Sequence, residues 1–80
     1  MGRPMFETLK EVLVGKLKAA SEKITPEATV EEAELDSLSI VELSIILEKD
    51  FTITITDDEL LAAPTIGDMA KLIEERNAAA

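Results

Sequence analysis

Ser37 is the side chain with the clearest potential for chemistry, because it follows Asp36 directly at the start of a helix-like apolar pattern. Taken alone, a serine in the first turn of a helix is more often a capping or surface residue. The chain contains no histidine and no cysteine, so it lacks the usual base for a serine nucleophile and has no thiol. A second enzyme can still modify this hydroxyl, because the helix N-terminus favours an attached phosphate group.

Carboxylates are the other chemically capable groups. The chain has 17 Asp and Glu against 8 Lys and Arg in 80 residues, which gives a net charge of -9. These groups can act as acids, bases or magnesium ligands, but no pair of them falls in a cleft that the sequence predicts. An enzyme with its own active site is therefore the least favoured interpretation, and no metal site is predicted.

The negative charge is concentrated in the middle of the chain. Residues 25–59 contain 11 acids and the single base Lys49. Such a surface repels nucleic acid and anionic membranes and attracts basic protein surfaces. Solubility alone explains net negative charge in many proteins, but the uneven distribution makes this central region the candidate contact surface.

Residues 36–50 are predicted to form a helix with Asp36 as its N-cap. A helix turns by about 100° per residue, so one face collects a typical core-facing stripe. The residues of this stripe are Ile40, Leu43, Leu47 and Phe51. A second apolar stripe lies on roughly the opposite side, and a small bundle cannot easily bury both.

The second stripe consists of Leu38, Val41 and Ile45 and has two interpretations. It can pack under a short neighbouring helix or the first loop and belong to the core. Alternatively it stays exposed between the carboxylates of Glu42 and Glu48, as a docking face for an apolar patch ringed by Lys and Arg. Such a face suits a protein that binds several partners transiently.

The first third of the chain is predicted to hold one helix and a long loop. Apolar residues at helical spacing between Met5 and Ala20 predict an amphipathic helix of about four turns. Residues 21–36 lack such a pattern, and Thr25-Pro26 resembles the start of at most one short helical turn. Four apolar residues can hold this loop on the core: Ile24, Ala28, Val30 and Leu35.

Two more helices are predicted after residue 56. Residues 51–56 alternate as in a strand, but no second strand is available, so we expect an extended segment. Residues 56–59 form a capping box that opens a short helix, which Pro64 closes. The last helix starts at residues 65–68 and carries Arg76 near its end. The expected fold is all-α: a bundle of three longer helices and one short helix in a single domain.

Several ordered segments resemble the acyl carrier protein family. The central motif is Asp36-Ser37-Leu38, and the matching residues that follow are Val41-Glu42-Leu43, Leu47-Glu48 and Phe51. Residues 24–30 resemble the family's loop before the attachment site, and residues 55–59 and 65–68 resemble the starts of its last two helices. The resemblance covers about residues 5–76, which is the part expected to be ordered within a domain spanning 1–80.

The resemblance implies an acyl-carrier-like four-helix bundle in which Ser37 carries 4'-phosphopantetheine from coenzyme A, a covalent cofactor whose thiol holds acyl groups as thioesters. Asp36 would help a phosphopantetheinyl transferase to bind its metal and orient the serine. Five residues would lie on the family's recognition helix: Leu38, Val41, Glu42, Ile45 and Glu48. The protein would be a carrier and not an enzyme, serving fatty acid or polyketide synthesis by discrete acyltransferases, ketosynthases and related enzymes with basic docking patches.

Three residues depart from the family's usual pattern. Glu34 stands where the family commonly has a glycine, which often serves a turn with positive φ. Ala33 replaces a frequent leucine, so the loop is expected to be less firmly anchored. Ile46 stands where fatty-acid carriers often have a smaller residue and would narrow an acyl cavity between the helices.

Two alternative functions stay open. A peptidyl or aminoacyl carrier has the same fold, but such carriers typically show Gly-Gly where this chain has Glu34-Leu35. A helical adaptor would use the second stripe and never carry an arm. No segment is typical of a signal peptide or membrane span, so we expect a cytoplasmic monomer that binds neither nucleic acid nor membrane.

Overall fold

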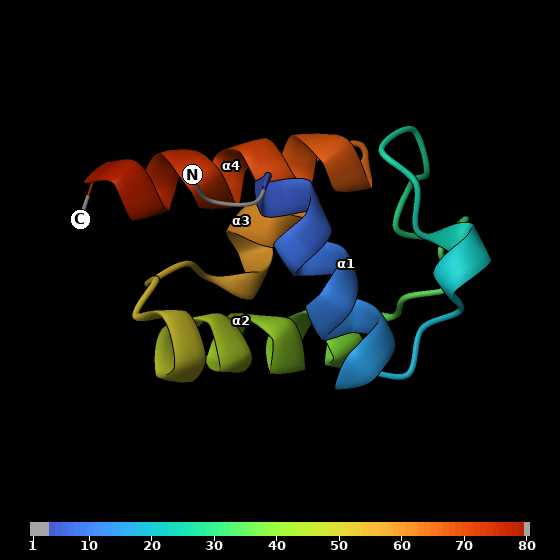
Figure 1. Cartoon of the computed structure of the whole chain (residues 1–80), viewed down its shortest axis with the longest axis horizontal. Coiled ribbons are helices and arrows are strands. Elements are labelled where there is room, and N and C mark those ends of the chain that lie inside the picture. The colour runs from blue at the N-terminus through green and yellow to red at the C-terminus, as the bar shows by residue number, and fades with distance from the viewer. Residues whose placement is uncertain (1–3, 80) are drawn as a thin grey trace.

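The computed structural model describes residues 4–79, and within that range the chain forms helices and no strand. The elements in order are α1 (Met5–Gly15), the 3-10 helix η1 (Ser21–Lys23), α2 (Ser37–Phe51), α3 (Asp57–Ala62) and α4 (Ile66–Ala79). In Figure 1, α2 and α4 lie on opposite sides of the molecule, and α1 and α3 lie between them. The all-α fold with three longer helices, one short helix and a long first loop is confirmed.

The core lies between the helices and is built from apolar side chains. No polar or charged side chain is buried in the part of the chain that the structure describes. On α2, Ile40, Leu43 and Leu47 are buried, and Phe51 is half-buried against them. The predicted core stripe of this helix is therefore confirmed, and removing its apolar surface from water is the main force that holds α2 to the bundle.

The first helix is shorter than predicted. The sequence pattern extends to Ala20, but α1 ends at Gly15, and Lys18 adopts a left-handed conformation with φ 59°. The chain reverses there because backbone hydrogen bonds close over the helix end, including one from the Ala19 amide to the Leu13 carbonyl at 2.9 Å. Leu17 still packs against the core from this turn, which explains why its spacing resembled a continuing helix.

The first loop packs against the core through the predicted apolar residues. Ile24, Ala28 and Leu35 are buried, and Val30 is half-buried. Only a single turn forms at Thr25-Pro26, as predicted, and the Ala28 amide donates to the Thr25 carbonyl at 3.2 Å. The 3-10 helix Ser21–Lys23 was not predicted.

Ala33 is buried in the same loop. Its amide donates to the Thr29 carbonyl at 3.0 Å, and the Thr29 and Glu32 side chains each accept a bond from the other residue's amide. These bonds form a compact turn before α2. The backbone around Ala33 is therefore held by its own hydrogen bonds.

The first loop also holds the start of α4. The amides of Ile66 and Gly67 donate to the carbonyls of Ala28 and Pro26, at 2.8 and 3.0 Å. A Cβ atom on Gly67 would lie 2.8 Å from the Pro26 oxygen, closer than real contacts allow. Glycine at position 67 therefore permits the close approach that fixes the loop to the helix.

Residues 52–56 form the predicted extended segment between α2 and α3. Thr52 has φ 58° and ends α2. Ile53 and Ile55 are buried, whereas the alternating threonines of this segment are exposed: Thr52, Thr54 and Thr56. The alternation that resembled a strand thus reflects one side of a single extended segment packed on the core.

Candidate attachment and docking site on helix α2

Asp36 determines where α2 begins. Its backbone is extended, and its Oδ1 accepts a hydrogen bond of 2.8 Å from the Ser39 amide. The Ile40 amide donates to the Asp36 carbonyl at 3.1 Å and closes the first helical turn. Asp36 is therefore the N-cap, as predicted.

The Asp36 carboxyl group is favoured in its ionised form. Hydrogen bonding from Ser39, first from its backbone amide and then from its side chain, lowers the pKa of Asp36 from its ordinary value. The bonds act on the anion because an ionised carboxylate only accepts hydrogen bonds. A negative charge is thus fixed next to Ser37 at neutral pH.

Ser37 is the first residue of α2 and its side chain is exposed. We observe no hydrogen bond from its hydroxyl to another residue in the range 4–79. The amides of a first helical turn have no acceptor within the helix, so an anionic group on this oxygen lies at the positive end of the helix dipole. An accessible, uncommitted hydroxyl at a helix start fits the attachment of a phosphate ester.

The turn before α2 orients this serine. Leu35 is buried, and its amide donates to the Val30 carbonyl at 3.0 Å. Glu34 has φ 60°, the left-handed conformation that the family's usual glycine adopts without cost. The Glu34 carboxylate lies 2.6 Å from the Lys23 Nζ atom. The backbone therefore makes the turn that a glycine would make, despite the larger residue.

The second stripe of α2 is largely exposed. The exposed fraction of the side chain is 64% for Leu38 and 44% for Ile45, whereas Val41 is half-buried. Burial of the whole stripe under α3 or the first loop is therefore wrong. Two large apolar side chains on a helix surface are typical of a binding face.

The predicted flanking carboxylates are also exposed. Glu42 and Glu48 both point to solvent, and neither forms an ion pair with another residue in the described range. At a rise of about 1.5 Å per residue, Glu48 lies about 16 Å along the helix from Ser37. One helix thus carries the exposed hydroxyl at its start and an apolar stripe with acidic flanks along its length.

Leu61 on α3 was not predicted as a surface residue. Its side chain is 41% exposed, whereas its neighbour Leu60 is fully buried. Two successive residues of a helix differ by about 100° in direction, and on this short helix Leu60 is the one that faces the core. The Leu60-Leu61 pair in the sequence was the signal that could have identified it.

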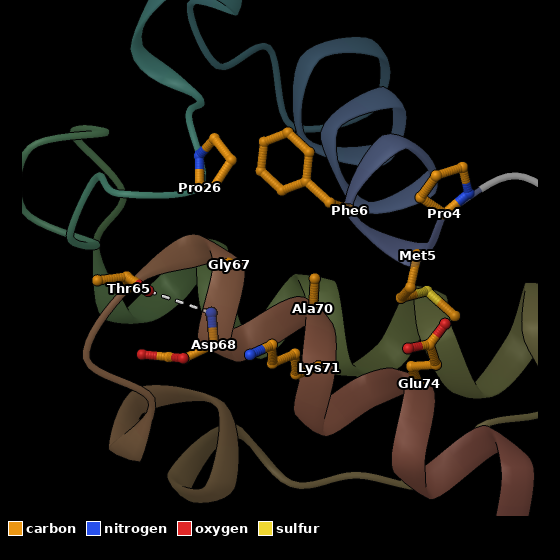
Figure 2. A pocket seen from close by; sticks show the side chains of 10 residues that line it. All are labelled: Pro4, Met5, Phe6, Pro26, Thr65, Gly67, Asp68, Ala70, Lys71 and Glu74. Carbon is orange, nitrogen blue, oxygen red and sulfur yellow. Dashed lines mark hydrogen bonds between the residues drawn. The ribbon is translucent and has the colours of Figure 1, made fainter.

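A cavity of about 400 Å³ lies away from this site. Its walls come from the start of α1, the first loop and the first half of α4. Figure 2 shows Phe6, Pro26 and Ala70 among its apolar lining, with Asp68, Lys71 and Glu74 also lining it. No residue of α2 lines this cavity, so it is separate from Ser37 and from the exposed stripe.

Among the residues that the structure describes, no group of three or more acidic, histidine or cysteine side chains could hold a metal ion. No helix in that range is long and apolar enough to cross a membrane.

Comparisons with known proteins agree on one family. The family model described as a phosphopantetheine attachment site matches residues 7–73. An acyl carrier protein of Sulfurovum sp. is 39% identical over 71 residues, which cover 88% of this chain and 95% of that protein. One of Clostridium perfringens is 38% identical over 72 residues, or 89% and 95%, and one of Wolinella succinogenes is 39% identical over 71 residues, or 88% and 93%.

The match covers both the helices and the exposed start of α2. The family model includes the whole of that helix and ends within α4, so no part of the site described above falls outside it. The chain belongs to the acyl carrier protein family, whose members carry a covalently attached 4'-phosphopantetheine group and act as carriers rather than catalysts.

Proposed function

We propose that Ser37 is the attachment point of the 4'-phosphopantetheine arm. The observation that supports this most strongly is the exposed Ser37 hydroxyl at the first position of α2, directly after the N-cap Asp36. It lies within the segment that matches the phosphopantetheine attachment model. The bound arm supplies a terminal thiol that holds acyl groups as thioesters, which this cysteine-free chain cannot supply itself.

The residues around Ser37 have separate tasks in this proposal. The Ser37 oxygen is the nucleophile that attacks the phosphate next to the pantetheine of coenzyme A, which breaks the pyrophosphate bond and releases 3',5'-adenosine bisphosphate. The transferase accepts the serine proton, because the chain has no histidine to do so. The Asp36 carboxylate fixes the helix start through the Ser39 amide and presents negative charge to a metal ion held by the transferase. The helix dipole then stabilises the phosphodiester on Ser37.

Docking is proposed for the exposed stripe and its flanks. Leu38, Val41 and Ile45 would contact an apolar patch of each partner, and Glu42 and Glu48 would face Lys and Arg at the rim of that patch. The transferase, acyltransferases and ketosynthases are the partner classes proposed. Carriage of acyl groups in fatty acid or polyketide synthesis by discrete enzymes is the pathway class that we propose.

The attachment is tested by incubating the protein with coenzyme A, magnesium and a broad-specificity phosphopantetheinyl transferase. Intact mass spectrometry should show the addition of one arm to the wild-type chain and none to Ser37→Ala. Ser39→Ala is the matched control, because it alters a serine in the same helical turn and should still be modified. Modification of Ser37→Ala would assign the arm to another residue, and no modification of the wild type would favour an adaptor that binds through the stripe.

A further inference from the structure

An ion pair crosses the first loop shortly before Ser37. The Lys23 Nζ atom lies 2.6 Å from the Glu34 carboxylate. Lys23 is the last residue of η1, whereas Glu34 stands two residues before the N-cap Asp36. The pair therefore joins the beginning of the loop to the turn from which α2 starts.

Glu34 gives that turn its direction. Its φ of 60° lies in the left-handed region, which is unfavourable for a residue with a Cβ atom. The Glu34 amide donates to the Glu31 carbonyl at 3.0 Å, and the next residue, Leu35, is buried. A change of Glu34 to a commoner backbone conformation would redirect the chain directly before Leu35 and Asp36.

The first turn of α2 depends on where the loop places Asp36. The Ser39 amide donates to the Asp36 Oδ1 atom at 2.8 Å, and the Ile40 amide donates to the Asp36 carbonyl at 3.1 Å. If the turn at Glu34 relaxes, these bonds are lost and Ser37 leaves its helical position. The later part of α2 stays in place, because its buried apolar residues pack on the core.

Lys23 is the partner that the loop supplies for Glu34. The sequence between Lys23 and Lys49 contains no Lys or Arg, so no neighbouring residue of the loop can replace it. The exposed fractions of the two side chains are 40% for Lys23 and 69% for Glu34. A pair this accessible shifts a conformational equilibrium by no more than about fivefold, which is enough to change how often Ser37 is in place without unfolding the bundle.

We propose that Lys23 is a positioning residue for the modification of Ser37. Its ion pair keeps Glu34 in the left-handed conformation, so that Asp36 caps α2 and the Ser37 hydroxyl keeps a constant place relative to the second stripe. Lys23 acts through Glu34 and takes no part in the transfer itself. The inference rests on the proposed attachment at Ser37 and adds to it a residue from the other end of the first loop.

Kinetics with the phosphopantetheinyl transferase measure this effect. Lys23→Met should lower kcat about two- to threefold with KM little changed, because the second stripe still docks but Ser37 is less often in place. Lys23→Arg should keep the wild-type kcat, since it keeps the ion pair. Lys16→Met is the matched control, because it removes an ion pair of equal length with Asp50, near the other end of α2, and its kcat should not change.

Two variants of Glu34 separate backbone conformation from charge. Both remove the carboxylate, but a glycine adopts the left-handed conformation without help and an alanine does not. Glu34→Gly should therefore keep the wild-type kcat, whereas Glu34→Ala should lower it as Lys23→Met does. Equal kcat values for these two variants would overturn the positioning role, because the rate would then not depend on the left-handed turn.

A second measurement does not use the transferase. Backbone amide hydrogen exchange, followed by NMR, reports whether the first turn of α2 is formed. The amides of Ser39 and Ile40 should exchange about two- to threefold faster in Lys23→Met than in the wild type, and at the wild-type rate in Lys16→Met. Unchanged exchange in Lys23→Met would overturn the proposal, since the ion pair would then not hold the helix start.

The outcomes separate this inference from the attachment proposal. If the wild type is not modified, the attachment proposal fails and Lys23 has no modification to position, whatever the exchange rates show. If Ser37 is modified and Lys23→Met has the wild-type kcat, the role of Lys23 is overturned while the attachment stands.

Discussion

Glu34 has the backbone conformation that glycine adopts most easily, two residues before the N-cap of α2. Its φ is 60°, where the Cβ atom of an L-residue crowds the following carbonyl at a cost of about 1–2 kcal/mol. The ion pair with Lys23 joins two largely exposed side chains, and such pairs contribute about 0–1 kcal/mol. The ion pair therefore offsets only part of the strain.

Replacement of Glu34 tests this strain directly. Glu34→Gly should be more stable than Glu34→Ala by about 1 kcal/mol, because both lose the ion pair and only glycine relieves the left-handed conformation. The free energy of unfolding in urea measures the difference. Lys23→Ala is the control for the ion pair and should lower stability by less than that amount. Equal stability of the Gly and Ala variants would show that the turn is not strained at this residue.

The single residues that could be predicted are those whose role is local. Asp36 as a cap and the exposed stripe of Leu38 and Ile45 follow from spacing along one helix. Glu48 and Asp57 line the same surface groove. The sequence could not predict this, because the segment between the two residues has to fold back first. Nothing in the spacing of charges along the chain shows that turn.

The third helix depends on groups outside itself. It spans Asp57–Ala62 and ends before Pro64, too short for its own hydrogen bonds to stabilise it. Its capping box could be predicted from Thr56 and Glu59, three residues apart. The pairing of Glu59 with Arg76 spans 17 residues and could not be predicted, because helix periodicity does not determine how α3 and α4 cross.

Because of the pairing between Glu59 and Arg76, the free energy of unfolding should depend on pH in the acidic range. The hydrogen bond from Arg76, aided by those from Thr56, lowers the pKa of Glu59 from 4.5 to about 2. A carboxyl group with a lowered folded-state pKa stabilises the fold above its unfolded pKa and loses that contribution as pH falls. The loss should therefore occur as pH falls from about 4.5 to about 2.

Urea unfolding of wild type and Glu59→Gln between pH 6 and pH 2 measures this contribution. The wild type should be the more stable at pH 6, and the difference should shrink as the pH approaches 2 because the carboxyl group becomes protonated. Arg76→Gln should show the same convergence, because it removes the other partner of the same pair. A difference between wild type and Glu59→Gln that stays constant with pH would contradict the proposed coupling.

The start of α1 was predictable and its end was not, for the same physical reason. Apolar spacing identifies which residues face the core, and Leu17 does pack there. Apolar spacing does not identify the backbone conformation that brings these residues to the core. Here the chain turns at Lys18, which has a left-handed conformation. Elements that end in side-chain caps or before proline are readable from the sequence, whereas ends closed by backbone bonds to a turn are not.

At the scale of the whole molecule, the acidic side chains are concentrated in one region of the chain. The acidic segment 25–59 holds 11 of the 17 acids, and it includes α2, the turn before it and the start of α3. The ion pairs within the described range, such as Lys16–Asp50 at 2.6 Å, are partly exposed and neutralise few of these acids. The field of the molecule is therefore most negative near the exposed stripe, and it should accelerate encounters with basic partners.

Charge and apolar contact make separable contributions to docking on α2. Glu42→Lys should lower kcat/KM with the phosphopantetheinyl transferase about three- to tenfold at low salt and reduce its dependence on salt, because the steering field is weakened. Ile45→Ala should lower kcat/KM with an unchanged salt dependence, because it removes apolar contact only. Circular dichroism should show native helix content for both variants, since neither side chain is buried.

Glu74→Lys is the matched control, because it makes the same charge change on α4, in the cavity of Figure 2 and away from the stripe. With both variants compared at 0.1 M salt, its effect on kcat/KM should be much smaller than that of Glu42→Lys, since the screening length is then only about 10 Å. If both lysine variants lower kcat/KM equally, the overall net charge governs the encounter and α2 is no specific docking face. If Ile45→Ala unfolds the protein, Ile45 supports the core and the stripe is not free to bind partners.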